Sequence, residues 1–192
     1  MITGSSTRLA LLLLILLTGL NLLVFSLGGG EYLQYQRHAI EHGQVWRLLT
    51  GHWVHLGATH FLLNLFGLLL LWQIIGNWLS TGEKLAVLLG SSLLISLGLY
   101  LFYPQIGWYR GLSGALHGLW LAGALLGMKR DWKLASLLLI LLLIKLVWEQ
   151  AFGPMAGSTI LTGGPVLIQA HLLGALSGLL MGVMIFIVRA FR

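Results

Sequence analysis

The sequence contains no cysteine and few charged residues, and both shortages limit what the protein can be. Without cysteine there is no disulfide framework, no thiol nucleophile and no thiolate metal site. Only 8% of the residues are charged, whereas 58% are hydrophobic and the mean hydropathy is +0.92. A soluble protein of this composition could not cover its surface with polar groups. The composition therefore predicts a membrane protein that has the lipid bilayer as its solvent.

The sequence also lacks the basic clusters that nucleic-acid binding requires. The formal net charge is +6, but the 11 Lys and Arg residues occur singly or in the short group Lys129, Arg130 and Lys133. No basic stripe with interleaved aromatic residues is present, so we expect no nucleic-acid partner. A length of 192 residues fits one domain, and we predict a single transmembrane domain over residues 1–192.

Six apolar stretches are long enough, or nearly so, to cross a hydrocarbon core of about 30 Å. The first follows a basic residue, as a signal peptide does, but it lacks a small-residue cleavage site and we keep it as a span. The predicted fold is therefore an all-α membrane protein with six transmembrane helices. The spans are Arg8–Leu27, Ala58–Leu79, Leu85–Tyr103, Leu112–Met128, Leu134–Gln150 and Ala170–Val188.

Basic residues near helix ends indicate the cytoplasmic side of a membrane protein. With the N-terminus inside, most of the basic residues fall on that side, and both termini are predicted to be cytoplasmic. The inner set is Arg8, Lys84, Lys129, Arg130, Lys133, Arg189 and Arg192, and the outer set is Arg37, Arg47 and Arg110.

Polar residues within the predicted spans need an explanation, because a charge at mid-membrane costs about 2.5–3.5 kcal/mol on insertion scales. The second, fourth and sixth spans run in the same direction, and each has polar residues at its outer end. These residues are His60 and Asn64, then Ser113, then His171. Their shared depth predicts a polar pocket near the outer face.

Ser113 is a candidate nucleophile. The stretch from Gly111 to Met128 has 18 residues, about 27 Å as a helix, so its start is expected below the outer surface in a pocket that water can reach. Gly111 and Gly114 leave the backbone little covered, and amide groups at a helix start favour developing negative charge. The alternative is an ordinary serine that caps a helix.

His171 is the candidate general base that would take the proton of the serine. Glycines follow it at intervals of four residues, a pattern that allows another helix to approach closely. If that neighbour is the fourth span, His171 comes within reach of Ser113. The alternative is a packing motif with an interfacial histidine. The glycines are Gly174, Gly178 and Gly182 on the sixth span, and Gly114 and Gly118 on the fourth.

His60 and Asn64 are four residues apart and therefore share a helix face. Their side chains could donate hydrogen bonds to an oxyanion, and one such donor is worth about 2.7–4 kcal/mol in a transition state. The alternative is that the pair serves as polar contacts between helices.

No third catalytic residue is evident from the sequence. Asp131 falls on the cytoplasmic side, and Glu149 is expected to pair with Lys145 one turn earlier. The prediction is therefore a Ser113–His171 dyad, with an unexpected role for Glu149 as the alternative. His117, four residues after Ser113, could compete as the base or tune the pocket.

Four motifs in order resemble those of rhomboid intramembrane proteases. They are Trp46-Arg47 (WR), His60-Phe61-Leu62-Leu63-Asn64 (HxxxN), Gly111-Leu112-Ser113-Gly114 (GxSG) and Ala170-His171-Leu172-Leu173-Gly174 (AHxxG). The resemblance implies a Ser113–His171 dyad, with His60, Asn64 and the Ser113 amide at the oxyanion hole. It also implies that Trp46-Arg47 stabilises the outer loop, that His55 is structural, and that the fifth helix and the loop after it gate substrate entry.

The longer sequence from Gly111 to Gly118, with His117, is similar to the GxSGxxHG signature of rhombosortases, a bacterial rhomboid branch. This resemblance implies location in the bacterial inner membrane with the site open to the periplasm. It implies cleavage of transmembrane proteins that carry a C-terminal Gly-Gly-type tail, with no cofactor or metal.

Two other function classes remain open from the sequence. A catalytically inactive rhomboid-like protein would bind membrane helices without cleaving them. A haem or metal protein could use His60, His117 and His171, or the loop histidines His38, His42, His52 and His55, because neutral imidazole is a common ligand.

Overall fold

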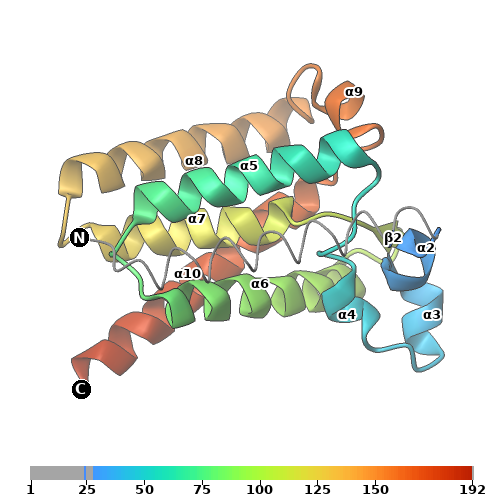
Figure 1. The fold of residues 1–192 in the computed structure, drawn as a ribbon, viewed down its shortest axis with the longest axis horizontal. Helices are drawn as coiled ribbons and strands as arrows, with labels where there is room; N and C mark the ends of the chain where they lie inside the picture. The colour runs from blue at the N-terminus through green and yellow to red at the C-terminus, as the bar shows by residue number, and fades with distance from the viewer. Residues whose placement is uncertain (1–23, 25–27, 192) are drawn as a thin grey trace.

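The computed structural model describes Val24 and residues 28–191, so the predicted first span, Arg8–Leu27, lies almost entirely outside the described residues. The described part is mostly helical, as predicted, and its long helices form a bundle (Figure 1). Four of these helices are long and apolar enough to cross a membrane: α5 (Ala58–Ile75), α6 (Thr81–Phe102), α8 (Trp132–Phe152) and α10 (Ile168–Ala190).

The fourth predicted span forms a helix that is too short to count with these four. Helix α7, Ser113–Gly127, has 15 residues, or about 22 Å at 1.5 Å per residue. It packs against α5, α6, α8 and α10, and most of its side chains are buried. Because protein surrounds α7, both of its ends can lie within the bundle.

Short elements gather at the end of the bundle where α7 begins (Figure 1). Strand β1 pairs antiparallel with β2, with Tyr35 opposite Tyr109 and Gln36 opposite Trp108. This pairing joins the predicted outer loop to the chain just before Ser113. The short elements are α2 (Gly30–Leu33), β1 (Tyr35–Gln36), α3 (Arg37–Glu41), α4 (Arg47–Thr50), β2 (Trp108–Tyr109) and, between α8 and α10, α9 (Ser158–Thr162).

Glycines let α7 and α10 approach until their backbones touch. A Cβ atom on Gly174 would lie 2.0 Å from the carbonyl oxygen of Gly114, and one on Gly178 would lie 2.2 Å from that of Gly118. The predicted close packing of these two helices is therefore present, and it determines how the start of α10 meets the start of α7.

The turn between α5 and α6 is held by polar caps. Ser80 and Glu83 form a reciprocal capping box at the start of α6. The buried Lys84 donates a hydrogen bond of 2.5 Å from Nζ to the carbonyl oxygen of Gly76, which ends α5. Lys84, which the sequence pattern assigns to the cytoplasmic side, thus also provides a hydrogen-bond donor for a carbonyl group at a helix end.

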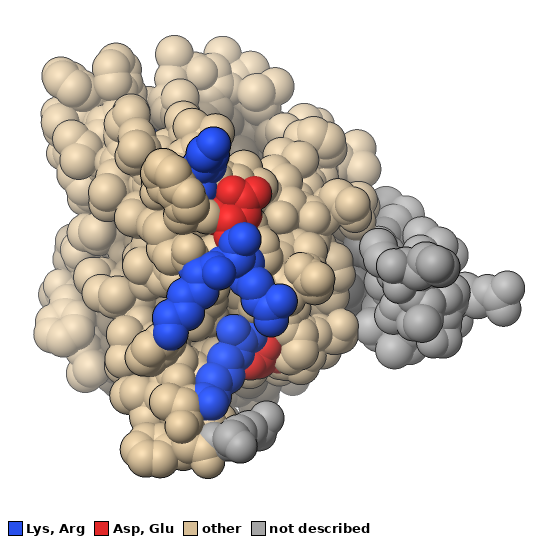
Figure 2. Space-filling view, turned by 90° about the vertical axis from the view of Figure 1, so that its left-hand side faces the viewer, with Lys and Arg blue, Asp and Glu red and all other residues tan. Residues whose placement is uncertain are grey.

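The end of the bundle where α7 stops and α8 starts carries exposed basic side chains, among them Lys129, Arg130 and Lys133. Figure 2 views this end and shows Lys and Arg side chains gathered beside acidic ones. Arg189, near the end of α10, forms an ion pair with Glu83, with 2.7 Å between Arg189 Nη2 and Glu83 Oε2. The basic end is thus opposite the end that holds Ser113.

Candidate active site

Ser113 and His171 form a hydrogen bond between two helices. The distance from Ser113 Oγ to His171 Nε2 is 3.0 Å, and His171 is buried in the first turn of α10. Leu112 is the N-cap of α7, and no side chain caps this helix. The interpretation of Ser113 as a helix-capping serine is therefore wrong. Its hydroxyl points to an imidazole that can accept its proton.

Glu149 contacts the other nitrogen of the same imidazole. Glu149 Oε2 lies 2.8 Å from His171 Nδ1, and Glu149 Oε1 accepts a hydrogen bond from Lys145. The expected local pair with Lys145 is present, but it accounts for only one carboxylate oxygen. The expectation of a dyad without a third group is therefore incomplete, because α8 brings a buried carboxylate against His171.

His117 lies against His171 rather than against the serine hydroxyl. The two imidazole rings are stacked, with centroids 4.2 Å apart and planes 12° apart. His117 Nδ1 is 2.7 Å from the carbonyl oxygen of Ser113, so this nitrogen carries the proton and donates it. The position of His117 therefore fits a residue that tunes the pocket better than a base that removes the Ser113 proton.

His60 and Asn64 lie around Gly111. A Cβ atom on Gly111 would lie 2.7 Å from His60 Nε2 and 3.7 Å from Asn64 Nδ2, and the φ angle of Gly111 is +122°. Both space and backbone conformation therefore favour glycine at this position. His60 Nδ1 accepts a weak hydrogen bond of 3.4 Å from the Leu56 amide, which leaves the proton of a neutral His60 on Nε2.

Tyr109 and Gly51 support the chain before Ser113, and the sequence reasoning missed both. The hydroxyl of Tyr109 donates to the carbonyl oxygen of Gly111 at 2.5 Å, and burial raises the pKa of Tyr109 to about 12. The Gly111 amide donates to the carbonyl oxygen of Gly51 at 3.1 Å. The available signal was the presence of buried polar groups next to the GxSG sequence. The hydrogen-bond partners of these groups depend on how the loop folds.

Trp46 and Arg47 lie in the predicted outer loop, and neither lines the pocket that contains Ser113. Arg47 is buried, and its Nη1 donates to the carbonyl oxygens of Glu31 at 2.7 Å and Gln34 at 2.9 Å. The ring of Trp46 contacts that of Tyr32, with centroids 5.7 Å apart. These contacts connect α4 to α2, and the stabilising role of Trp46-Arg47 stays a prediction.

The site residues line a pocket of about 270 Å³. Its lining also includes residues of the loop between α8 and α10, among them Met155 and Ser158. Its polar lining comprises His60, Asn64, Tyr109, Arg110, Ser113, His117, Lys145, Glu149, Ser158, Thr162 and His171.

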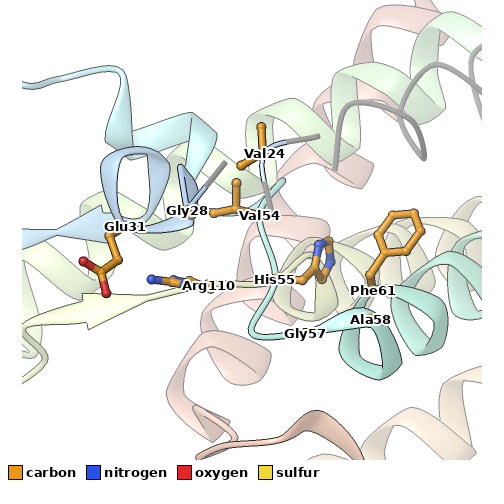
Figure 3. A pocket seen from close by; sticks show the side chains of 10 residues that line it. Val24, Gly28, Glu31, Val54, His55, Gly57, Ala58, Phe61 and Arg110 are labelled. Carbon is orange, nitrogen blue, oxygen red and sulfur yellow. The ribbon is translucent and has the colours of Figure 1, made fainter. Parts of the chain in front are cut away.

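A second pocket, of about 190 Å³, lies beside α2 and the start of α5. Figure 3 shows Arg110 pointing toward Glu31 at one end of it, with His55 and Phe61 at the other. Neither Ser113 nor His171 lines this pocket, whereas both line the first.

His117, Glu149 and His171 could also hold a metal ion, since their ligand atoms lie within 4.8 Å of one another. Each already has a protein partner: His117 bonds Ser113, Glu149 bonds Lys145, and His171 bonds both Ser113 and Glu149. The stacked rings also hold their in-plane lone pairs in two separate, nearly parallel planes, whereas the ligands of one ion must converge on it. The geometry therefore favours a hydrogen-bonded relay over a metal centre.

The loop histidines occupy separate environments. His38 and His42 contact each other, with ring centroids 4.3 Å apart, whereas the buried His52 bonds Ser96 at 2.9 Å. His55 packs edge-on against His60 and Phe61. Within the described residues, these four histidines form no metal-binding group.

Comparison with protein families identifies one domain in the sequence. The rhomboid domain matches residues 42–188, about three quarters of the chain, and this range includes Ser113, His171, Glu149, His60 and Asn64. Among curated proteins, none matches the sequence. Rhomboid domains are typically those of intramembrane serine proteases. The chain therefore belongs to the rhomboid domain family.

Proposed function

We propose that the protein is an intramembrane serine endopeptidase in which Ser113 is the nucleophile and His171 the general base. The observation that carries the proposal is the distance of 3.0 Å between Ser113 Oγ and His171 Nε2 inside the pocket. Helices α7 and α10 hold this contact by glycine packing one turn away, so the pair needs no rearrangement to react.

The first half of the reaction forms an acyl-enzyme. Ser113 Oγ attacks the carbonyl carbon of the scissile peptide while its proton moves to His171 Nε2. The carbonyl electron pair moves onto oxygen to give a tetrahedral oxyanion. When that intermediate collapses, the C–N bond breaks and His171 returns the proton to the leaving amine.

Three groups are proposed to bind the oxyanion: His60, Asn64 and the backbone amide of Ser113. His60 has its proton on Nε2, beside Gly111, because Nδ1 is an acceptor. Asn64 Nδ2 donates one hydrogen to the His60 carbonyl oxygen at 3.2 Å, and its second hydrogen remains for a substrate. Ser113 begins α7, where the amide groups and the helix dipole favour negative charge.

The second half releases the acyl group. A water molecule, or another nucleophile in a transfer reaction, gives its proton to His171 and attacks the ester carbon. Ser113 Oγ then leaves and regains its proton. Substrate access is proposed to pass α8 and the segment 153–167. The support is that Met155, Ser158 and Thr162 of this segment line the pocket, and that Gly153, Gly157 and Gly163 have positive φ angles.

The proposed topology is a single domain, residues 1–192, with six transmembrane helices and both termini in the cytoplasm of a bacterium. The site would then open to the periplasmic side of the inner membrane. The support is the exposed basic end of the bundle, which is typical of the cytoplasmic side and lies opposite Ser113.

The proposed substrates are membrane proteins with a C-terminal Gly-Gly-type tail, as for rhombosortases. Support comes from the GxSGxxHG sequence, Gly111 to Gly118, in which His117 lines the same pocket as Ser113.

The test compares the wild type with Ser113→Ala and His171→Ala on a membrane substrate with a Gly-Gly tail. Mass spectrometry reads the new C-terminus, and a fluorophosphonate probe reports the reactive serine. We expect the wild type to cleave and to be labelled, and both variants to do neither. Equal labelling of Ser113→Ala would refute the nucleophile. Binding of substrate without cleavage by the wild type would instead support the inactive membrane-helix binder.

A further inference from the structure

The carboxylate of Glu149 fixes the orientation of the imidazole that faces Ser113. Both ring nitrogens of His171 are engaged: Nδ1 lies 2.8 Å from Glu149 Oε2 and Nε2 lies 3.0 Å from Ser113 Oγ. An ionised carboxylate only accepts hydrogen bonds, so the ring proton must be on Nδ1. Nε2 therefore presents its lone pair to the serine hydroxyl, which is the tautomer that a general base requires.

Glu149 is itself held in place. Its side chain is 2% exposed, and Lys145, one turn earlier on α8, donates to the oxygen that His171 does not use. A buried carboxylate is costly unless it is paired, and here both oxygens have a partner. Lys145, Glu149, His171 and Ser113 thus form a continuous chain of hydrogen bonds across α8, α10 and α7.

We propose that Glu149 is a positioning residue that makes the site a Ser113–His171–Glu149 triad, with Lys145 orienting the carboxylate. The inference rests on the proposed function of the Ser113–His171 pair. When the Ser113 proton moves to Nε2, the ring becomes an imidazolium beside the carboxylate. Glu149 stays ionised, keeps accepting the Nδ1–H bond and stabilises the new charge. No proton moves to Glu149 at any step.

The other groups around His171 do not replace this role. His117, from α7, stacks on the ring face and has no bond to its nitrogens. His60, from α5, lines the pocket near Gly111. Lys145 is a cation and cannot accept the Nδ1 proton. Among the charged and titratable groups described around the ring, Glu149 alone bonds its Nδ1.

The test uses Glu149→Gln, Glu149→Asp and, as a matched control on the same helix, the exposed neighbour Gln150→Ala. We expect Glu149→Gln to lower kcat by about 100- to 10,000-fold with KM within about threefold. The acidic limb of the pH–rate profile should move to lower pH, because the imidazolium loses its anionic partner. Glu149→Asp should keep more activity than Glu149→Gln, and Gln150→Ala should match the wild type.

A second readout does not need activity. Proton NMR of protein with ¹⁵N-labelled histidine should show a low-field Nδ1 proton in the wild type and in Ser113→Ala. His171→Ala assigns the resonance by removing it, and Glu149→Gln should lose or shift it. An unchanged resonance and an unchanged acidic limb in Glu149→Gln would overturn the triad, whatever the total activity. A wild type that neither cleaves nor labels would defeat the proposed function, while the NMR result would still decide the Glu149 contact.

Discussion

Gly111 connects backbone conformation to the candidate oxyanion site. Its φ angle of +122° is one that residues with a side chain rarely adopt, and a Cβ atom would lie 2.7 Å from both Cε1 and Nε2 of His60. We expect Gly111→Ala to displace His60 and to lower the rate of fluorophosphonate labelling at least about 100-fold, the scale of losing one oxyanion donor. Labelling kinetics measure this.

Gly107→Ala is the matched control, because Gly107 is an exposed residue of the same loop with open space around a Cβ atom. Gly107→Ala should label at the wild-type rate. Wild-type labelling of Gly111→Ala would remove His60 from the proposed oxyanion site.

His52 makes stability depend on pH. It is fully buried in a loop beside α6, and burial lowers its pKa from 6.5 to about 3. Between these values the unfolded chain binds a proton that the folded chain excludes, so stability falls as the pH falls. Relative to pH 7, this residue lowers the free energy of unfolding at pH 5 by about 2 kcal/mol. His55, with a pKa also lowered by burial to about 3, acts in the same direction.

We expect His52→Gln, which can still bond Ser96, to reduce the difference in unfolding free energy between pH 7 and pH 5 by about 2 kcal/mol. Denaturant unfolding in detergent measures both values. The exposed His42→Gln should retain the wild-type difference. If His52→Gln retains it as well, the buried imidazole is not the source of the pH dependence.

At the residues of the candidate site, sequence reasoning rests on the cost of placing polar groups in the bilayer. Ser113 and His171 are identifiable because a hydroxyl and an imidazole in apolar spans need a reason to be there. The same reasoning finds Glu149 but not its second partner. Spacing along one helix reveals Lys145, whereas contact with His171 depends on how α8 lies beside α10. The sequence pattern does not contain that arrangement.

The pairing of helices α7 and α10 explains why the two site residues meet. A Cβ atom on Gly178 would lie 2.2 Å from the carbonyl oxygen of Gly118, and backbone cannot move aside as a flexible side chain can. We expect Gly178→Ala to separate the helices, to cost about 1–3 kcal/mol of stability and to lower labelling of Ser113. Thermal unfolding in detergent and probe labelling measure the two effects.

Gly182→Ala provides the control within the same glycine stripe. A Cβ atom there would lie 3.5 Å from Ala122 Cα, an ordinary contact, so we expect nearly wild-type stability and labelling. Equal effects of the two substitutions would show that the close approach at Gly178 does not hold the site together.

At the scale of whole helices, the sequence predicts the presence of a helix better than it predicts the length of that helix. The second, third, fifth and sixth predicted spans correspond to α5, α6, α8 and α10, because long apolar runs leave few alternatives. The fourth becomes the 15-residue α7, enclosed by its neighbours. A helix surrounded by protein and one surrounded by lipid are both apolar all round, so hydropathy does not distinguish them.

Across the described residues, the exposed basic side chains gather at the end of the bundle opposite Ser113. At the Ser113 end, Arg37 Nη2 donates to carbonyl oxygens at the end of α6, including that of Leu99 at 2.8 Å, and Arg47 donates to loop carbonyls. Arg110 donates to Gln34 Oε1 at 2.8 Å. The three arginines of the predicted outer side are thus engaged in the fold. Lys129, Arg130 and Lys133 at the other end are exposed, a placement that is typical of the cytoplasmic side of a membrane protein.

This asymmetry predicts the orientation of the site, and the absence of cysteine makes a direct test possible. Gly107→Cys introduces a thiol at the Ser113 end, and Arg130→Cys introduces one at the basic end. In spheroplasts, we expect a membrane-impermeant maleimide to label Gly107→Cys at once and Arg130→Cys only after permeabilisation. The cysteine-free parent gives the background. The reverse pattern would place the Ser113–His171 pair at the cytoplasmic face, where tails of exported proteins could not reach it.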